Sequence, residues 1–313
     1  ECDQMLALDF EAQLDFILDK LPRARQTLLF SATMTSRIDK ITRASLKNPQ
    51  TITASKGKYE TVEGLQQNYM FVPFCYRFAY LHHYLTSLPR DFVIIIFCAT
   101  NAIVMKAAHL LRILGLRSLP LAGTMSQEDR VLALDSFRSK KVNILVCTDV
   151  AQRGIDVPDV DLVINFQMPA SPKDYIHRVG RTARIGRTGS AVTFVTQYDI
   201  QEYLEIEKAL GKKLEEIPID KEDIEPNLER IEQAEREAAT RIREEEEIGG
   251  FSVTRRQKKR KSGKSMASIG SKMLESEYDQ DANLRQVRRQ NESILGENKQ
   301  QRWHKAKQLR KQL

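Results

Sequence analysis

The sequence predicts an α/β fold built on a parallel sheet that helices cover on both faces. Short apolar stretches, typical of strands, lie at 68–72, 92–98, 118–121, 143–147, 160–166 and 190–195. Stretches with helical spacing lie between most of them, at about 75–88, 101–114, 126–139 and 172–184. Continuous apolar strands such as 93–97 are buried on both faces. Strands that alternate with helices form crossover units, which produce a parallel sheet.

Composition indicates a globular protein with additional polar sequence. The 313 residues are 41% apolar and 29% charged, and the length suggests about two domains. We find no apolar run that could span a membrane and no signal peptide, so we expect no membrane partner. The four cysteines (Cys2, Cys75, Cys98 and Cys147) form no C-x-x-C pair. This favours a reducing compartment, with Cys98 and Cys147 as small core residues.

The chain divides into four parts by pattern. Residues 1–54 read as the end of a domain, with a helix at 13–21, a strand at 26–30, further helical spacing at 38–46 and a short strand at 51–53. Residues 55–64 are polar, contain two glycines and suit an interlobe linker. Residues 65–220 hold the regular α/β pattern, and a helix at 199–210 is expected to end at Gly211. Residues 221–313 form a charged tail.

The tail changes the sign of its charge along its length. Residues 222–247 hold 11 acidic and 4 basic residues, a net charge of −7, and favour a long charged helix over 225–247. Residues 251–313 hold 17 basic and 6 acidic residues, a net charge of +11, and include the basic run 255–261. We expect this second part to be largely disordered when free. An acidic partner such as nucleic acid and a merely solvated arm both remain open, and the run is also compatible with a nuclear localisation signal.

Three arginines at a spacing of three stand out between Tyr175 and Arg187. On a helix, Arg178, Arg181 and Arg184 would share about a third of the circumference. Gly180 inside this run suggests close backbone approach, because glycine costs about 1 kcal/mol there relative to alanine. A guanidinium fork suits phosphate oxygens. The spacing alone leaves a phosphate site and a solvated basic face equally open.

Further candidates follow the predicted strands. Thr100, Gly123 and the pair Thr148-Asp149 each come directly after one of them. Functional residues of parallel α/β sheets collect at these carboxyl ends. Two simpler interpretations also apply, since Thr148-Asp149 could cap a helix and Gly123 could serve only a turn.

Together these strings resemble the DEAD-box RNA helicases, over most of residues 1–220. The matching strings are Glu1-Cys2-Asp3, read as the remnant of an Asp-Glu-x-Asp motif, Ser31-Ala32-Thr33, Ile96 to Thr100, Gln127 to Arg130, Thr148 to Asp156 and His177 to Arg184. Strings such as Phe194 to Asp199 and Ala209 to Lys213 are similar to the subfamily that processes pre-ribosomal RNA. Cys2 departs from the family's usual alanine.

The resemblance implies a complete second RecA-like lobe at 65–220, the end of a first lobe at 1–54, and ATP with Mg²⁺ between the lobes. It gives catalytic roles to Glu1, Asp3, Arg181 and Arg184, the two arginines as arginine fingers. It gives ATP contacts to Asp156, Arg181 and Arg184. It gives interlobe coupling to Ser31, Ala32, Thr33, Arg153 and His177. It gives RNA-backbone contacts to Thr100, Gly123, Arg130, Thr148 and Gly154.

The resemblance further implies an ATP-dependent RNA helicase that acts in ribosome biogenesis in the nucleolus, with pre-ribosomal RNA and assembly factors as partners and a monomeric state. No G-x-x-x-x-G-K-[ST] loop occurs in the sequence. We therefore expect the phosphate-binding loop, and the first Asp that would hold Mg²⁺, to precede Glu1, and these 313 residues alone to be inactive. The alternatives are a non-catalytic RNA-binding adaptor and a DNA-directed ATPase of the same superfamily.

Overall fold

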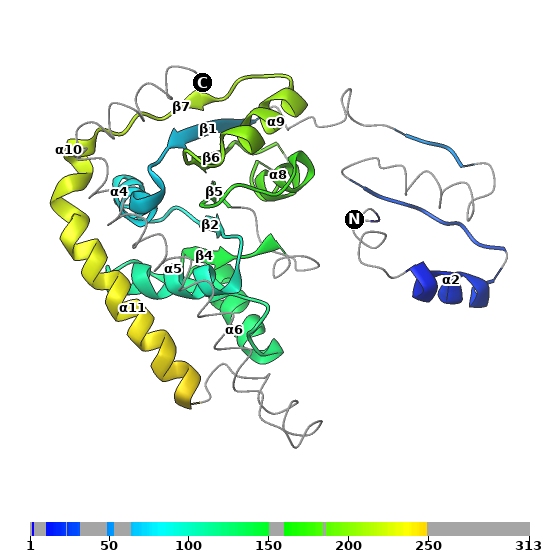
Figure 1. Cartoon of the computed structure of the whole chain (residues 1–313). Helices are drawn as coiled ribbons and strands as arrows, with labels where there is room; N and C mark the ends of the chain where they lie inside the picture. The colour runs from blue at the N-terminus through cyan, green and yellow to red at the C-terminus, as the bar shows by residue number, and fades with distance from the viewer. Residues whose placement is uncertain are drawn as a thin grey trace, which may run out of the picture.

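The computed structural model describes residues 2, 11–22, 24–31, 49–52, 64–149, 160–183 and 186–248. Within these ranges, seven parallel strands form one sheet in the order β3-β4-β2-β5-β6-β1-β7 (Figure 1). They are β1 (Leu65–Phe71), β2 (Ile94–Phe97), β3 (Ser118–Leu121), β4 (Ile144–Cys147), β5 (Leu162–Asn165), β6 (Gly189–Val195) and β7 (Glu215–Glu216). The first six match the predicted strands, which confirms the parallel α/β sheet.

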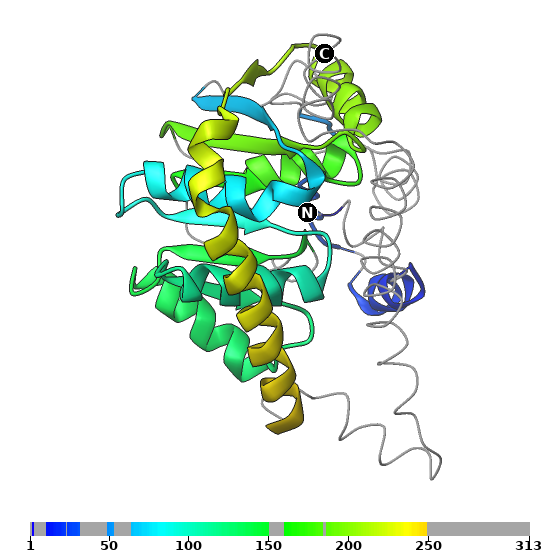
Figure 2. The same ribbon diagram turned by 60° about the vertical axis from the view of Figure 1, so that its left-hand side comes forward.

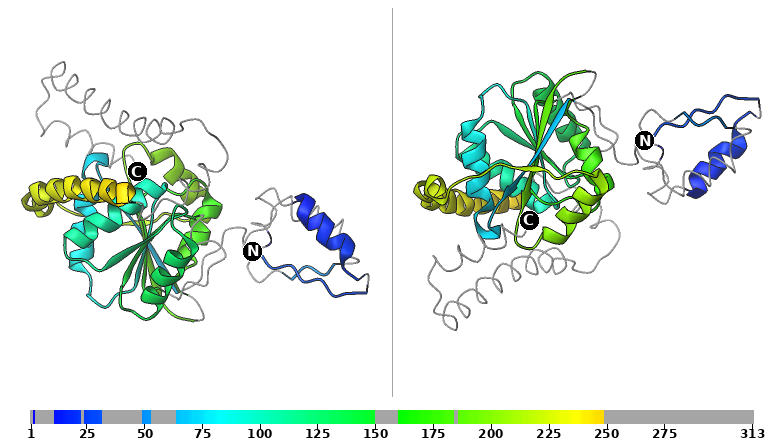
Figure 3. Two further views of the ribbon diagram at one scale, coloured as in Figure 1. Left: turned by 90° about the horizontal axis from the view of Figure 1, so that it is seen from below. Right: turned by 90° about the horizontal axis from the view of Figure 1, so that it is seen from above.

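Helices cover both faces of this sheet (Figure 3). One face carries α4 (Arg77–Ser87), α5 (Asn101–Ile113) and α11 (Leu228–Ile248), and the other carries α6 (Gln127–Arg138), α8 (Pro172–Val179) and α9 (Ile200–Leu210). The shorter elements are η1 (Phe74–Tyr76), α10 (Lys221–Ile224) and η2 (Glu225–Asn227), and α2 (Glu11–Lys20) lies in the N-terminal segment. None of the helices in the described ranges is long and apolar enough to cross a membrane.

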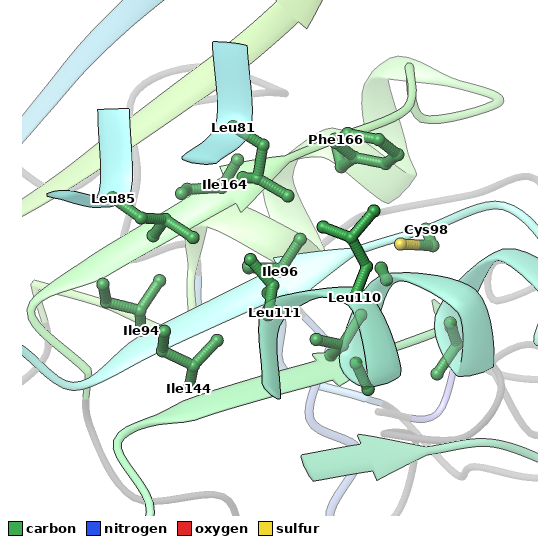
Figure 4. Close-up of a cluster of buried hydrophobic side chains, with 14 of the residues drawn as sticks. Leu81, Leu85, Ile94, Ile96, Cys98, Leu110, Leu111, Ile144, Ile164 and Phe166 are labelled. Carbon is green, nitrogen blue, oxygen red and sulfur yellow. The ribbon is translucent and has the colours of Figure 1, made fainter. Parts of the chain in front are cut away.

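Side chains of the central strands alternate between the two apolar layers. In β2, Ile94 and Ile96 point into the layer beneath α4 and α5, where Leu81 and Leu110 also lie (Figure 4). Ile95 belongs to the opposite layer. Each fully buried aliphatic side chain contributes about 1.5–3 kcal/mol. The period of two and the burial on both faces explain why the strands read as continuous apolar runs.

Serine caps fix the starts of α6 and α8. The hydroxyls of Ser126 and Ser171 accept hydrogen bonds from the amides of Asp129 (3.1 Å) and Asp174 (3.2 Å), and donate to the carboxylates of the same residues. Such caps satisfy amides that the first helical turn leaves without partners. At the end of α9, Gly211 adopts a left-handed conformation with φ of 68°, which confirms the predicted C-cap.

The acidic helix α11 packs on the lobe instead of standing apart from it (Figure 2). Ile231, Ala234 and Ala238 are buried in the layer formed with α4 and α5. Glu235 forms an ion pair with Lys106 of α5 (2.7 Å), and a carboxylate oxygen of Glu245 lies 3.2 Å from Nε2 of His109 of α5. The long charged helix was predicted, but the core continues past residue 220, where we expected the lobe to end. The sequence pattern did not reveal this packing because two of the three buried residues, Ala234 and Ala238, are only weakly apolar.

Two other expectations need correction. Residues 26–30 form no strand, and Leu28 and Phe30 are 65% and 74% exposed. A strand needs a hydrogen-bonded neighbour, and apolar content alone does not supply one. Thr51 and Ile52 are not in a strand either. The helical spacing expected at 38–46 and most of the expected linker lie outside the described residues.

The helix expected over 172–184 ends earlier, at Val179. Gly180 is its C-cap residue, so it stands at the end of the helix and not within it. The close backbone approach expected at Gly180 is local, because an added Cβ would lie 2.9 Å from the carbonyl oxygen of Ile176. Arg178 and Arg181 therefore do not share one helical face.

Candidate functional site

Three predicted RNA-contact residues lie at one edge of the sheet. Thr100 follows β2, Gly123 follows β3 and Thr148 follows β4, and these strands are neighbours. Both β2 and β3 end opposite Cys147, the last residue of β4, so the three strands end level. Adjacent strands are about 4.8 Å apart. The structure thus brings Thr100, Gly123 and Thr148 together along roughly 10 Å of the carboxyl edge.

The two outer positions of this edge are joined by one side chain. Thr100 is the N-cap of α5, and its hydroxyl accepts a hydrogen bond from the amide of Ile103 (3.3 Å). The next residue, Asn101, accepts a hydrogen bond through its Oδ1 from the amide of Gly123 (3.0 Å). Asn101 was not among the predicted site residues. Its position one residue after a capping threonine is the signal that could have identified it.

Internal packing does not require a glycine at Gly123. A Cβ placed there would lie 3.7 Å from the Asn101 side chain, an ordinary contact, and the residue is exposed. A glycine that the protein itself does not need leaves space for a ligand to approach the backbone. Arg130 lies in the first turn of α6, beyond the Gly123 loop, and is half-buried. Thr148 lies deeper and is 7% exposed.

Arg178 is the centre of a buried polar network at the same edge. Its Nε and Nη2 atoms donate to the two carboxylate oxygens of Asp149, and both distances are 2.7 Å. Its Nη1 atom donates to the carbonyl oxygen of Gln167 (2.8 Å) and to Oδ1 of Asn165 (3.3 Å). The residue is 1% exposed. The structure fits neither of the two alternatives that the spacing left open for Arg178, a phosphate site and a solvated basic face, because its donors are engaged inside the protein.

Gln167 extends this network to the loop after β2. Its Oε1 accepts a hydrogen bond from the amide of Ala99 (2.8 Å), directly before Thr100. The guanidinium of Arg178 also lies 5.2 Å from the ring centre of Phe97. The network thus links α8 to the loops after β2, β4 and β5. Neither Gln167 nor Asn165 was predicted, although a polar residue at the end of a buried strand is a usable signal.

Arg181 lies at the opposite end of the strands, where they begin. Its carbonyl oxygen accepts a hydrogen bond from the amide of Val160 (3.3 Å), and Thr182 pairs with Val160 just ahead of β5. Arg181 therefore does not lie at the carboxyl ends, where Thr100, Gly123 and Thr148 lie. Helix α8 instead runs from the carboxyl edge, where Ser171 caps it, to the amino edge, where Arg181 follows it.

The turn that carries Arg181 lies tightly against β6. A Cβ on Gly189, the first residue of β6, would lie 2.1 Å from Oγ1 of Thr182 and 2.6 Å from the amide nitrogen of Ala183. Ala183 has a positive φ of 57°, which is rare for a residue with a side chain. Arg181 itself is 8% exposed. The sequence alone did not predict that the close contact of this turn with β6 requires a glycine at position 189.

The other predicted residues are only partly described. His177 is half-buried on α8, and Ser31 is half-buried in the N-terminal segment. The residues that lie outside the described ranges are Glu1, Asp3, Ala32, Thr33, Arg153, Gly154, Asp156 and Arg184. Cys98 and Cys147 are fully buried, as predicted, and burial raises the pKa of the Cys98 thiol to about 12. Neither thiol is a reactive group at neutral pH.

Comparison with protein families gives one matching family model. Residues 76–186 match the helicase conserved C-terminal domain. This range contains β2 to β5, α8 and the whole Arg178 network, so the match falls on the elements that form the candidate site.

Curated relatives are helicases by name. The chain is 48% identical over 250 residues to the ATP-dependent RNA helicase DDX47 of Drosophila melanogaster, covering 80% of this chain and 49% of that protein. It is also 48% identical over 250 residues to the ATP-dependent rRNA helicase RRP3 of Ajellomyces capsulatus, covering 80% and 51%. The chain spans about half the length of these relatives.

Among solved structures, the chain is similar to Saccharomyces cerevisiae Dbp5 bound to RNA and ADP BeF3. The TM-score is 0.64 at 28% sequence identity, covering 76% of this chain and 61% of that chain. The RecA-like character of the lobe is thereby confirmed.

Proposed function

Because the chain belongs to the DEAD-box family of RNA helicases, we propose that it carries the C-terminal lobe of an ATP-dependent RNA helicase that locally unwinds or remodels RNA. The curated relatives bear that activity in their names. ATP is the energy source, and RNA is the substrate. The observation that carries the proposal is the shared edge at which Thr100, Gly123 and Thr148 lie.

The chemistry of this edge suits a sugar-phosphate backbone. Hydroxyls of threonine and a backbone left open at Gly123 can contact phosphates and riboses, and Arg130 adds a cation. Such contacts position a strand and carry no sequence information. Selection of RNA over DNA would come from contacts with 2′-hydroxyls. Gly154 belongs to the same proposed set of contacts.

For the amino ends of the strands, where Arg181 lies, we propose contacts with the nucleotide. We assign to Arg181 and Arg184 the stabilisation of charge on the transferred phosphoryl group, a role worth roughly 10³–10⁵ in rate in other nucleotide hydrolases. Asp156 would contact the ribose. Glu1 and Asp3 would act from the first lobe, where Mg²⁺ would be held mainly through ATP. Mg²⁺ neutralises phosphate charge in such sites.

Helix α8 gives the two edges a physical connection. Arg178 binds Asp149 at the RNA edge, and Arg181 follows the same helix at the nucleotide edge. A shift of α8 on lobe closure would therefore reach both sites. Coupling to the first lobe would run from Arg153 and His177 to Asp3 and to Ser31, Ala32 and Thr33.

The biological setting is proposed from the relatives. One of them is named as an rRNA helicase. We propose pre-ribosomal RNA as the substrate, ribosome assembly factors as partners, a monomeric state, and the nucleolus as the site of action.

ATP hydrolysis tests the proposal, measured on a protein that joins this chain to a complete first lobe. RNA should stimulate turnover more than DNA of the same sequence, and Arg181→Ala should abolish the stimulation. Arg138→Ala serves as the control, because Arg138 is 43% exposed on α6 and forms a 3.7 Å ion pair with Asp135. Equal stimulation by DNA would favour a DNA-directed ATPase. RNA binding without turnover in any variant would favour an adaptor.

A further inference from the structure

A second polar and aromatic cluster occupies the carboxyl edge beyond the proposed RNA contacts. It consists of Phe74, Arg77, Phe166 and Tyr198, which we call the aromatic platform. The rings of Phe74 and Tyr198 meet edge to face at 5.6 Å between centres. The guanidinium of Arg77 lies 4.3 Å from the ring centre of Phe74 and 5.5 Å from that of Phe166. Neither the predicted site nor the Arg178 network includes these residues.

The loops that carry the platform are held together by hydrogen bonds. Oε1 of Gln197 accepts from the amide of Phe74 (3.2 Å), which ties the loop after β6 to η1. The carboxylate of Asp199 accepts from the amide (3.0 Å) and the hydroxyl (2.5 Å) of Thr196. Tyr198 lies between these anchored positions and is nevertheless 65% exposed. The ring of Tyr198 is therefore held in place by its loop while most of its surface remains open to a ligand.

The platform continues the edge on which Thr100 lies. Thr100 follows β2, Phe166 follows β5 and Tyr198 follows β6, and these three strands are neighbours in that order. The amide of Phe166 donates to the carbonyl oxygen of Phe97 (3.0 Å), and Phe166 and Cys98 lie at the same end of the core cluster (Figure 4). The strands that Thr100 and Tyr198 follow, β2 and β6, are two strand spacings apart, roughly 10 Å.

We propose that the aromatic platform stacks an unpaired base of the RNA whose backbone crosses Thr100, Gly123 and Thr148. The proposal rests on the proposed function and adds a base contact to it. Ring faces accept any base, so the contact would be tolerant of sequence. The ring of Tyr198 offers the exposed face, and the rings of Phe74 and Phe166 hold Arg77 beside it.

Charge favours RNA over an apolar protein segment as the occupant. Arg77 places a cation between two rings, an arrangement that suits a base flanked by phosphates. The nearby carboxylate of Asp199 is engaged by two donors of Thr196, which reduces its repulsion of phosphate. Continuity with the proposed backbone contacts also points to the same strand of RNA.

Equilibrium binding to RNAs of increasing length tests the platform, on a protein that contains both lobes. The series starts from the shortest RNA bound and adds one nucleotide at a time at either end. Wild-type affinity should rise about tenfold when the added base reaches the platform. Tyr198→Ala should lose that step and leave the affinity for the shortest RNA unchanged, whereas Tyr198→Phe should keep it. Leu204→Ala, an exposed aliphatic position on α9, is the control.

The outcomes separate the two proposals. Tyr198→Ala could keep the affinity step, or it could lower the affinity for the shortest and the longer RNAs equally. Either result would show that the platform does not stack a base, although the proposed RNA binding would stand. A protein partner would then be the better occupant. If the wild-type protein binds none of the RNAs, the proposed function itself fails. A photoreactive uridine placed at the step should crosslink to residues 196–199, and crosslinking elsewhere alone would overturn the assignment.

Discussion

The guanidinium of Arg178 forms a two-point ion pair with the carboxylate of Asp149, with both N–O distances at 2.7 Å. The Arg178 side chain is 2% exposed and that of Asp149 is 26% exposed. A buried pair of this geometry needs both partners, because loss of one leaves the other charged group buried without compensation. It joins the loop after β4 to α8, which come from distant parts of the sequence.

Removal of one partner should therefore destabilise the lobe. We expect Arg178→Ala to lower the free energy of unfolding by about 3–5 kcal/mol. Arg178→Lys should recover only part of this loss, because an ammonium group cannot form the planar two-point contact. Chemical denaturation of the chain measures both. Arg138→Ala, whose exposed ion pair is worth less than about 1 kcal/mol, is the control. A loss for Arg178→Ala no larger than the control would contradict the structural role.

Gln167 should tune RNA binding with little effect on folding. Gln167→Leu removes the acceptor for the Ala99 amide, at a cost of about 1 kcal/mol in stability. Because Ala99 directly precedes Thr100, we expect a higher KM for RNA in RNA-stimulated ATP hydrolysis, with kcat nearly unchanged. Gln167→Glu keeps an oxygen acceptor and should behave like wild type. Equal KM values for the leucine and glutamate variants would show that the bond does not position the loop.

Two glycines offer a matched comparison of folding and binding. An added Cβ at Gly189 would lie 2.1 Å from Thr182, so Gly189→Ala should destabilise the lobe by about 1–3 kcal/mol. At Gly123 the nearest atom would lie 3.7 Å away, so Gly123→Ala should fold normally. We expect Gly123→Ala to weaken RNA binding roughly tenfold, equivalent to about 1.4 kcal/mol. Thermal unfolding and RNA titration of both variants check this, and unchanged RNA affinity in Gly123→Ala would remove the residue from the RNA edge.

Docking of α11 should weaken in mild acid. Burial, followed by the charge of Arg112, lowers the pKa of His109, and Glu245 and Arg241 of α11 also face it. Burial, then Arg230 of α11 and His83, lowers the pKa of His82. The unfolded chain therefore binds these protons more readily, and stability rises with pH. The loss begins as pH falls through about 6.5, the unfolded value.

A double variant tests this dependence. Between pH 7.5 and pH 5, we expect the melting temperature of the wild type to fall more than that of His82→Gln/His109→Gln. His304→Gln is the control, because His304 lies in the basic segment 251–313 and not in the sequence of α4 or α5. Parallel pH profiles for the wild type and the double variant would show that the buried histidines do not govern the loss.

The sheet was predictable because its strands are buried on both faces. Apolar runs such as 93–97 have one interpretation when helical stretches separate them. The same criterion wrongly predicted a buried strand at residues 26–30, where the apolar run is exposed and belongs to no strand. Apolar content reports a preference for burial, but pairing depends on neighbours that a local pattern does not contain.

The candidate site was predictable in its residues more than in its geometry. Strand ends identified Thr100, Gly123 and Thr148, since topology brings such ends together. The spacing of three residues suggested one helical face for Arg178 and Arg181. The helix instead ends at Val179, and Arg181 lies at the amino ends of the strands. The partners of Arg178 come from the end of β5 and from the loops after β4 and β5. Contacts of that kind depend on tertiary packing, which a spacing of three residues cannot encode.

Docking of α11 also sets the charge on one side of the lobe. The helix is roughly 30 Å long from its length and rise per residue, and it lies against α4 and α5 along part of that length. It thereby holds eight acidic and four basic residues, a net charge of −4, on that side of the lobe. Any change that loosened α11 would expose its buried stripe and move this negative charge away from α4 and α5.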